Sequence, residues 1–433
     1  MAPDPIKLNT LDYLRFVEDS PSSFHAARLV TDRLVEAGFT EHPEDGPWST
    51  EPGGHVMVRD GAAMAWWIPT GGTTDDTAFR IVGAHTDSPW FVLKPNPNAT
   101  TPDGWQQIGV EVYGGMLWNS WLDRELSVAG RVLTADGSEH LVRTGAVARI
   151  PQLAIHLDRG VNDGLKLNPQ THLHPVWTVD EPDADILALV TRDAGIEAEH
   201  GEVVAADLNL IPSQAPGTFG SDGQFIAAGR QDNLSSVHSG LTAMERMAKG
   251  GKLDSSGDIL VFACFNHEEI GSATNVGAAG PILQEVLERT ATGLGWDAER
   301  LARAYANSTC VSSDAGHSVH PNYPEMHDPD TRPVMGRGPM LKINAKQRYA
   351  TNARGAALWS RSLKAAGVDG QEFVSRNDVP CGSTIGPITA TRLGILTVDV
   401  GIGLLSMHSA REMSHEADLA GISKVLEAYW LGA

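Results

Sequence analysis

Two adjacent carboxylates, Glu268 and Glu269, closely follow an apolar run at residues 259–265. A buried strand that ends in two acids suits metal chemistry, because one carboxylate can bind a metal ion while its neighbour activates a water molecule as a general base. A helix start whose first turn carries acids to complement the helix dipole would show the same two residues. Other motifs in the chain are needed to choose between these interpretations.

Four further positions carry a metal-binding type of side chain in a similar setting. His85, Asp314 and His408 each come shortly after a short apolar run. Asp87 lies two residues after His85, so in extended chain both side chains point the same way and Asp87 can orient the imidazole. Asp232 lies at the start of an amphipathic helix, where its alternative role is simple N-capping.

These positions are expected to converge in space. In open α/β sheets the active site forms outside the carboxyl ends of the strands, where residues distant in sequence meet. Two histidines and three carboxylates suit a pair of Zn²⁺ ions with one bridging carboxylate, and Mn²⁺ or Co²⁺ would also fit. The pattern therefore favours metal-dependent hydrolysis.

The elements that must position these residues alternate in type. Helical periodicity is present at residues 10–38, where Ser20 and Pro21 are expected to start the second of two helices, and again at 233–249 and 419–431. Short apolar strands alternate with helices over much of the remaining chain. This order predicts an α/β fold with a mixed, mostly parallel sheet flanked by helices.

One long segment departs from that alternation. Residues 96–224 are rich in short β-like segments, Pro and Gly, and show few helical periods. We predict that they form an inserted β-rich domain. Residues 1–95 plus 225–433 then form a discontinuous catalytic domain.

Composition narrows the class of protein. The 433 residues carry a formal net charge of −21, which argues against binding to nucleic acid or to anionic membranes. The cysteines, at 264, 310 and 381, have no CxxC spacing, which argues against a secreted disulfide framework. The amino terminus lacks the pattern of a signal peptide, and no run approaches the ~18 apolar residues of a transmembrane helix. We expect a cytoplasmic protein.

Longer motifs resemble one known family, the aspartyl aminopeptidases, which are cytoplasmic dinuclear zinc exopeptidases. The similarity runs through nearly the whole chain and includes GAHTDSP at 83–89, LWNSWLDR at 117–124, LAIHL at 153–157, QDN at 231–233, HEEIGS at 267–272, HPNY at 320–323, QRY at 347–349 and PCGSTIGP at 380–387. Motifs of this length in this order are highly specific.

The resemblance assigns the metal ligands. It implies two zinc ions per subunit, with Asp232 as the bridge between them. Glu269 and His408 complete one site, and His85 and Asp314 complete the other. The zinc pair would polarise the scissile carbonyl and hold the free α-amino group of the substrate, so that only the terminal residue is removed.

The resemblance also assigns catalytic and substrate-binding residues. Glu268 is implied as the general base. His156, in the inserted domain, is implied to reach the active site of a neighbouring subunit, although a role as metal ligand stays open. Lys342 is implied to hold an acidic side chain of the substrate, with Tyr349 and His320 in matching motifs nearby.

We therefore expect a zinc aminopeptidase that hydrolyses N-terminal Asp, and also Glu, from peptides. The inserted domain is expected to mediate self-association, and similar proteins form homododecamers. Val92 occupies a position where relatives are expected to carry Arg, so the preference for acidic residues is expected to be broader here if that Arg reads the substrate. The alternatives are a dinuclear-metal amidase or deacylase acting on N-acyl amino acids, and a non-catalytic, metal-stabilised peptide-binding assembly.

Overall fold

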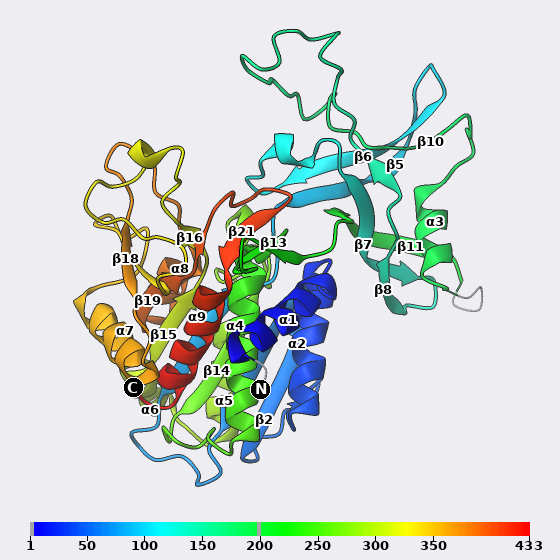
Figure 1. Cartoon of the computed structure of the whole chain (residues 1–433). Helices are drawn as coiled ribbons and strands as arrows, with labels where there is room; N and C mark the ends of the chain where they lie inside the picture. The colour runs from blue at the N-terminus through cyan, green and yellow to red at the C-terminus, as the bar shows by residue number, and fades with distance from the viewer. Residues whose placement is uncertain (1–3, 197–200) are drawn as a thin grey trace.

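A nine-stranded mixed sheet forms the centre of the larger part of the chain (Figure 1). The structure is a computed structural model that describes residues 4–196 and 201–433. The order of strands across this sheet is β1 (Thr40–Glu41), β2 (Gly53–Arg59), β3 (Ala62–Ile68), β14 (Ile259–Phe265), β4 (Phe79–His85), β15 (Thr309–Ser313), β19 (Leu396–Gly401), β17 (Met340–Ile343) and β18 (Gln371–Val374).

The middle of this sheet is parallel, which aligns the carboxyl ends of its strands. β14, β4, β15 and β19 are consecutive neighbours and run in the same direction. β14 consists of seven buried residues, as expected for a strand covered on both faces. The predicted mixed, mostly parallel sheet flanked by helices is confirmed.

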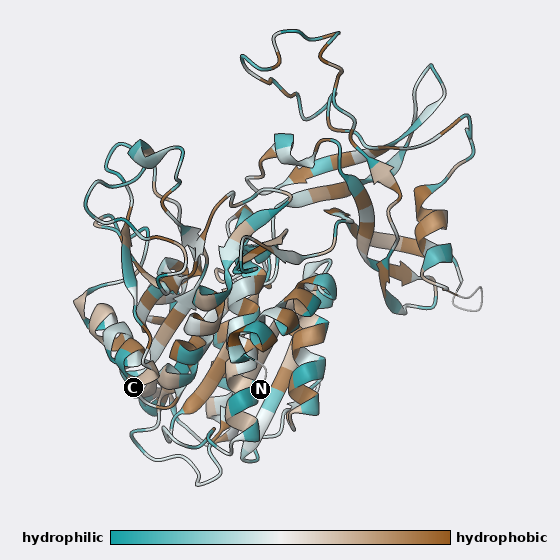
Figure 2. Cartoon of the chain, viewed as in Figure 1, coloured by the Kyte–Doolittle hydropathy of each residue, from teal (hydrophilic) through white to brown (hydrophobic). Residues whose placement is uncertain are grey.

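Helices cover both faces of the sheet and bury two apolar cores. α1 (Pro5–Glu18), α2 (Ser23–Glu36), α4 (Gln231–Lys249), α7 (Ala353–Ala366) and α9 (Glu416–Trp430) pack on one face. α5 (Ile282–Gly293), α6 (Ala298–Asn307) and α8 (Ile385–Leu393) pack on the other. Figure 2 shows the apolar residues gathered in the sheet and polar residues on outward helix surfaces. No helix within the described ranges is both long and apolar enough to cross a membrane.

A second sheet has seven strands and is closed by pairing of β11 with β7. Its strands lie in the order β11 (Val203–Pro212), β5 (Trp90–Thr100), β6 (Trp105–Tyr113), β10 (Val176–Val179), β9 (Ala148–Arg149), β7 (Glu125–Thr134) and β8 (Glu139–Arg143). They belong to an antiparallel, barrel-like domain that also contains α3 (Ile186–Asp193). β5 begins a few residues before the predicted boundary at residue 96, and the division into domains stays a prediction.

Shorter elements lie outside the two large sheets. β12 (Gly217–Phe219), β13 (Phe225–Ala228) and β21 (Glu412–His415) form a small antiparallel sheet, and β16 (Gly316–His317) pairs with β20 (Gly403–Leu404). Single turns of 3₁₀ helix lie at η1 (Trp118–Trp121), η3 (Glu268–Ile270) and η4 (Pro324–Met326).

The start of α2 differs from the prediction. Ser22, and not Ser20, is the N-cap, and its side chain accepts a hydrogen bond from the backbone N–H of His25. Ser22 has the extended conformation of an N-cap, whereas Ser20 and Pro21 lie before the helix. The cap prediction was wrong because several candidate serines stand close together and their spacing does not distinguish them.

Candidate metal centre

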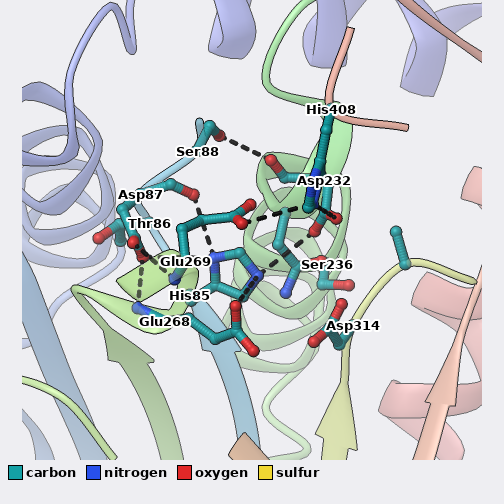
Figure 3. A network of polar contacts seen from close by, with 12 residues as sticks. His85, Thr86, Asp87, Ser88, Asp232, Ser236, Glu268, Glu269, Asp314 and His408 are labelled. Carbon is teal, nitrogen blue, oxygen red and sulfur yellow. Dashed lines mark hydrogen bonds and ion pairs between the residues drawn. The ribbon is translucent and has the colours of Figure 1, made fainter. Parts of the chain in front are cut away.

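The carboxyl ends of the parallel strands bring most of the sequence-derived residues together (Figure 3). His85 is the last residue of β4. Glu268 and Glu269 lie in η3, directly beyond β14, and Asp314 directly follows β15. Each position results from a buried apolar strand that ends at the same edge of the sheet.

Asp232 and His408 complete the cluster. The Nε2 atom of His85 lies 3.3 Å from Asp232 Oδ1 and 3.9 Å from Glu268 Oε2. The Nε2 atom of His408 lies 3.4 Å from both Asp232 Oδ2 and Glu269 Oε2. Asp232 thus turns one carboxylate oxygen toward each histidine, as Figure 3 shows.

The chemistry of these donors fits divalent cations. Asp232 Oδ1 and Glu269 Oε1 are buried oxygens that accept no hydrogen bond from residues 4–196 or 201–433. One donor atom each from His85, Asp232 and Glu269 lies within 4.8 Å of the others. Burial, reinforced by neighbouring carboxylates, raises the pKa of Glu268 to about 8 and that of Asp314 to about 6. The cluster is buried and contains more carboxylates than positively charged groups, so a divalent cation would balance its charge. Carboxylates and imidazoles are also the ligands that zinc prefers.

Asp87 holds one half of the cluster. Its carboxylate accepts hydrogen bonds from the backbone N–H groups of Glu268 and Glu269, both at 3.1 Å, and from the hydroxyl of Tyr113 at 2.7 Å. The Nδ1 atom of His85 lies 3.0 Å from the Asp87 carbonyl oxygen and 3.4 Å from its carboxylate. This arrangement would let Asp87 orient the His85 imidazole, and that role stays a prediction.

Glu412 holds the other half and was missed in the sequence. Its buried carboxylate accepts hydrogen bonds from the backbone N–H of Asp232 at 3.1 Å and from that of His408 at 2.8 Å. Ser88 donates to the carbonyl oxygen of Asp232 at 2.6 Å. Asp232 itself has non-helical backbone angles and precedes Asn233 through a cis peptide bond. Asp232 therefore precedes the regular part of α4 and is not a side-chain N-cap.

Lys342 is a buried cation beside the cluster. It lies on β17, and its Nζ donates to the carbonyl oxygen of Ala315 at 2.6 Å and lies 3.7 Å from Asp314 Oδ1. The ammonium also lies 5.4 Å from the ring centroid of Tyr349. The ring of Phe373 packs 6.2 Å from that of Tyr349. Lys342 and Tyr349, both sequence-derived candidates, thus share one aromatic-walled environment.

Two other candidates are not part of this cluster. His156 lies on the projecting loop of residues 151–175, between β9 and β10, which Figure 1 shows far from the central sheet of the same chain. His320 contacts its own loop, where Nδ1 accepts a hydrogen bond from the N–H of Asn322 and the ring packs against Tyr323. Substrate binding by His320 stays a prediction.

Val92 lies outside the environment of Lys342. It lines a cavity of about 310 Å³ at the junction of the two sheets, together with Trp90, Tyr113 and His267. Tyr113 separates this cavity from Asp87, to which its hydroxyl is bound. The expectation that relatives carry Arg at this position stays a prediction.

Comparison with known proteins assigns the chain to a family. The model of the family described as "Aminopeptidase I zinc metalloprotease (M18)" matches residues 16–430. A protein of Streptomyces avermitilis named "Probable M18 family aminopeptidase 2" is 47% identical over 428 residues, 98% of each chain. A protein of the same name from Mycobacterium bovis is 41% identical and covers 96% of each chain.

Two solved structures share the fold. The structure described as the Ape4 and Nbr1 complex superposes with a TM-score of 0.94 at 32% identity, covering 98% of this chain and 86% of that one. The mApe1 dodecamer of S. cerevisiae superposes with a TM-score of 0.86 at 26% identity, covering 98% of this chain and 97% of that one.

Proposed function

Because the chain belongs to the aminopeptidase I family of zinc metalloproteases (M18), we propose that it releases Asp, and also Glu, from the free amino terminus of peptides. The catalytic part of the proposal is supported above all by Asp232, which turns one carboxylate oxygen toward His85 and the other toward His408. A carboxylate between two nitrogen ligands suits a bridged pair of metal ions. Mn²⁺ or Co²⁺ would suit the same donors.

The proposed ligands divide between two zinc ions. Asp232 would lie between the ions, with His85 and Asp314 on one and Glu269 and His408 on the other. When bound, the ions supply a Lewis acid for the scissile carbonyl and positive charge that favours ionisation of water.

Glu268 is the proposed general base. It would take a proton from the attacking water and deliver it to the leaving amine. Its backbone N–H donates to Asp87, which fixes the start of η3, while its side chain turns toward His85. Its neighbour Glu269 turns toward His408, so the two adjacent acids face different partners.

Lys342 is the residue proposed to bind the acidic side chain of the substrate. Its ammonium is buried and carries positive charge within 3.7 Å of Asp314, which directly follows β15 at the edge of the cluster. A fixed local cation is needed because the chain as a whole has a net charge of −21 and repels acidic peptides at long range. Tyr349 packs against the same ammonium and would help to fix it.

Self-association would complete the site. One structural neighbour is described as a dodecamer, and we propose a homododecamer for this chain as well. The loop that carries His156 exposes Leu153 (61%) and Leu157 (75%), apolar surface that another subunit would cover. His156 would then reach the neighbouring active site and stabilise the tetrahedral intermediate.

One experiment tests class and specificity together. Zinc content is measured on the purified protein, and hydrolysis is followed on Asp-, Glu-, Ala- and Leu-terminated peptides with free or acetylated amino termini. We expect two zinc ions per subunit, release of Asp and Glu well above Ala and Leu, and no reaction on acetylated peptides. Faster reaction on acetylated substrates would favour the amidase or deacylase. Zinc binding without turnover would favour the peptide-binding assembly, and equal rates on all four free peptides would refute the acidic preference.

A further inference from the structure

The end of β6 carries the chain from the second sheet directly to the metal centre. Tyr113 is the last residue of β6, and its hydroxyl donates to Asp87 Oδ2 at 2.7 Å. Its ring stacks on Trp90 with centroids 5.7 Å apart and lies 6.3 Å from the ring of His267. These contacts hold the ring in one orientation, with the hydroxyl directed at a buried carboxylate.

The next residues continue along the cluster. Gly114 has a φ of +75°, and a Cβ there would lie 3.1 Å from Glu269 Cβ, so the backbone passes tightly against this acid. The carbonyl oxygen of Gly115 lies 2.9 Å from His408 Nδ1. The N–H of Leu117 donates to the carbonyl oxygen of His408 at 2.9 Å. Residues 113–117 thus touch both the Asp87 half and the His408 half of the centre.

We infer that residues 113–117 are a structural part of the metal centre, and that Tyr113 is a positioning residue which fixes Asp87 and, through it, the backbone of Glu268 and Glu269. This inference deepens the proposed function and rests on it for the roles of the two acids. The second sheet would then contribute to catalysis, in addition to the proposed contribution of its domain to self-association.

The hydrogen bonds that Asp87 accepts explain why the Tyr113 hydroxyl is important. The Asp87 side chain is fully buried, and its carboxylate needs donors on both oxygens. Oδ1 accepts from Glu268, whereas Oδ2 accepts from Glu269 and Tyr113. Each oxygen would keep one backbone donor without the phenol, but Oδ2 would lose its shortest hydrogen bond, at 2.7 Å against 3.1 Å, which would weaken the hold of Asp87 on η3 and on His85. Outer partners of metal ligands act in this way on metal affinity and activity.

The test is Tyr113→Phe in the zinc-loaded, full-length protein. We expect zinc affinity, measured by competition with a chromogenic chelator, or kcat, or both, to fall about 10- to 100-fold. KM should change little, because the hydroxyl faces Asp87 and not the substrate. Tyr429→Phe is the matched control, since Tyr429 is buried and its hydroxyl donates to the Thr309 carbonyl oxygen at 2.8 Å, far along β15 from the cluster. It should leave zinc affinity, kcat and KM unchanged.

Wild-type zinc affinity and kcat in Tyr113→Phe would overturn the inference, as would a rise in KM alone. If this variant does not fold, Gly114→Ala carries the test, because its added methyl group presses on Glu269 and should also weaken zinc binding. If the wild-type protein hydrolyses none of the peptides, the proposed function fails, yet chelator competition still decides whether residues 113–117 support the metal centre.

Discussion

Replacement of Glu268 by Gln separates the functions of the two adjacent acids. Glutamine keeps the shape of the side chain but lacks a basic oxygen, so the variant removes the proposed proton acceptor and little else. The side chain is 16% exposed, and its Oε2 lies 3.9 Å from His85 Nε2. A positioned general base contributes about 10²- to 10⁴-fold to the rate, so we expect kcat to fall by that factor, or about 3–5 kcal/mol in the barrier.

Glu269→Gln is the natural comparison because it makes the same chemical change one residue away. The Glu269 side chain is 4% exposed, and its Oε2 lies 3.4 Å from His408 Nε2. As a proposed ligand it should lose zinc when it loses its charge. Glu268→Gln should instead keep the zinc content of the wild type, and its thermal midpoint should not fall, because the amide has the same shape and size as the carboxyl group and cannot ionise in the buried site.

The assay combines elemental analysis of zinc with steady-state kinetics on an Asp-terminated peptide. Glu299→Gln serves as control, since this side chain on α6 is 71% exposed and far from the cluster in the fold. Near wild-type turnover by Glu268→Gln with full zinc would refute the role of base. Zinc loss from Glu268→Gln would show that this residue is a ligand.

Lys342→Met should lower the ratio of kcat/KM for Asp- over Ala-terminated peptides tenfold or more, since loss of one partner of a buried charge pair costs about 2–5 kcal/mol; an unchanged ratio would place substrate recognition elsewhere. His156→Phe should lower kcat at unchanged zinc content, whereas zinc loss would favour a ligand role. Burial, with the charges of Arg143 and Arg230, lowers the pKa of His25 from 6.5 to about 4. Between these values the unfolded chain binds a proton that the folded chain does not, so the free energy of unfolding should fall by about 1.4 kcal/mol per pH unit as pH falls. His25→Gln should flatten that slope in urea unfolding, and an unchanged slope would contradict the assignment.

Local sequence patterns were sufficient where a residue's position follows from its own strand. The apolar runs before His85, Glu268 and Asp314 predicted three strand ends, and the parallel order of β4, β14 and β15 brings those ends to one edge. The alternation of side chains along extended chain also predicted Asp87 beside His85. The resemblance to zinc exopeptidases is confirmed by the family model.

Contacts set by tertiary packing had no such signal. Tyr113 meets Asp87 from the second sheet, and Glu412 meets Asp232 across 180 residues of chain. A lone Tyr at the end of a strand and a lone Glu near a histidine are ordinary in any sequence. The position of His156 raises a different problem, because its proposed target lies on another subunit and no feature of one chain determines it.

Asp87 and Glu412 together suggest how the centre keeps its geometry. Both carboxylates are buried, and both bind backbone N–H groups next to the proposed ligands instead of the ligand oxygens. Glu412 joins the backbone of Asp232 to that of His408, and Asp87 joins η3 to Tyr113 at the end of β6, so each acid restrains two chain segments at once. The oxygens of Asp232 and Glu269 remain directed at the histidines, where a cation can bind them. In the proposed site, Asp87 and Glu412 therefore position the chain, whereas Asp232 and Glu269 bind the metal. A substitution of Asp87 or Glu412 should disturb two ligands together, whereas a substitution of one ligand should remove that ligand alone.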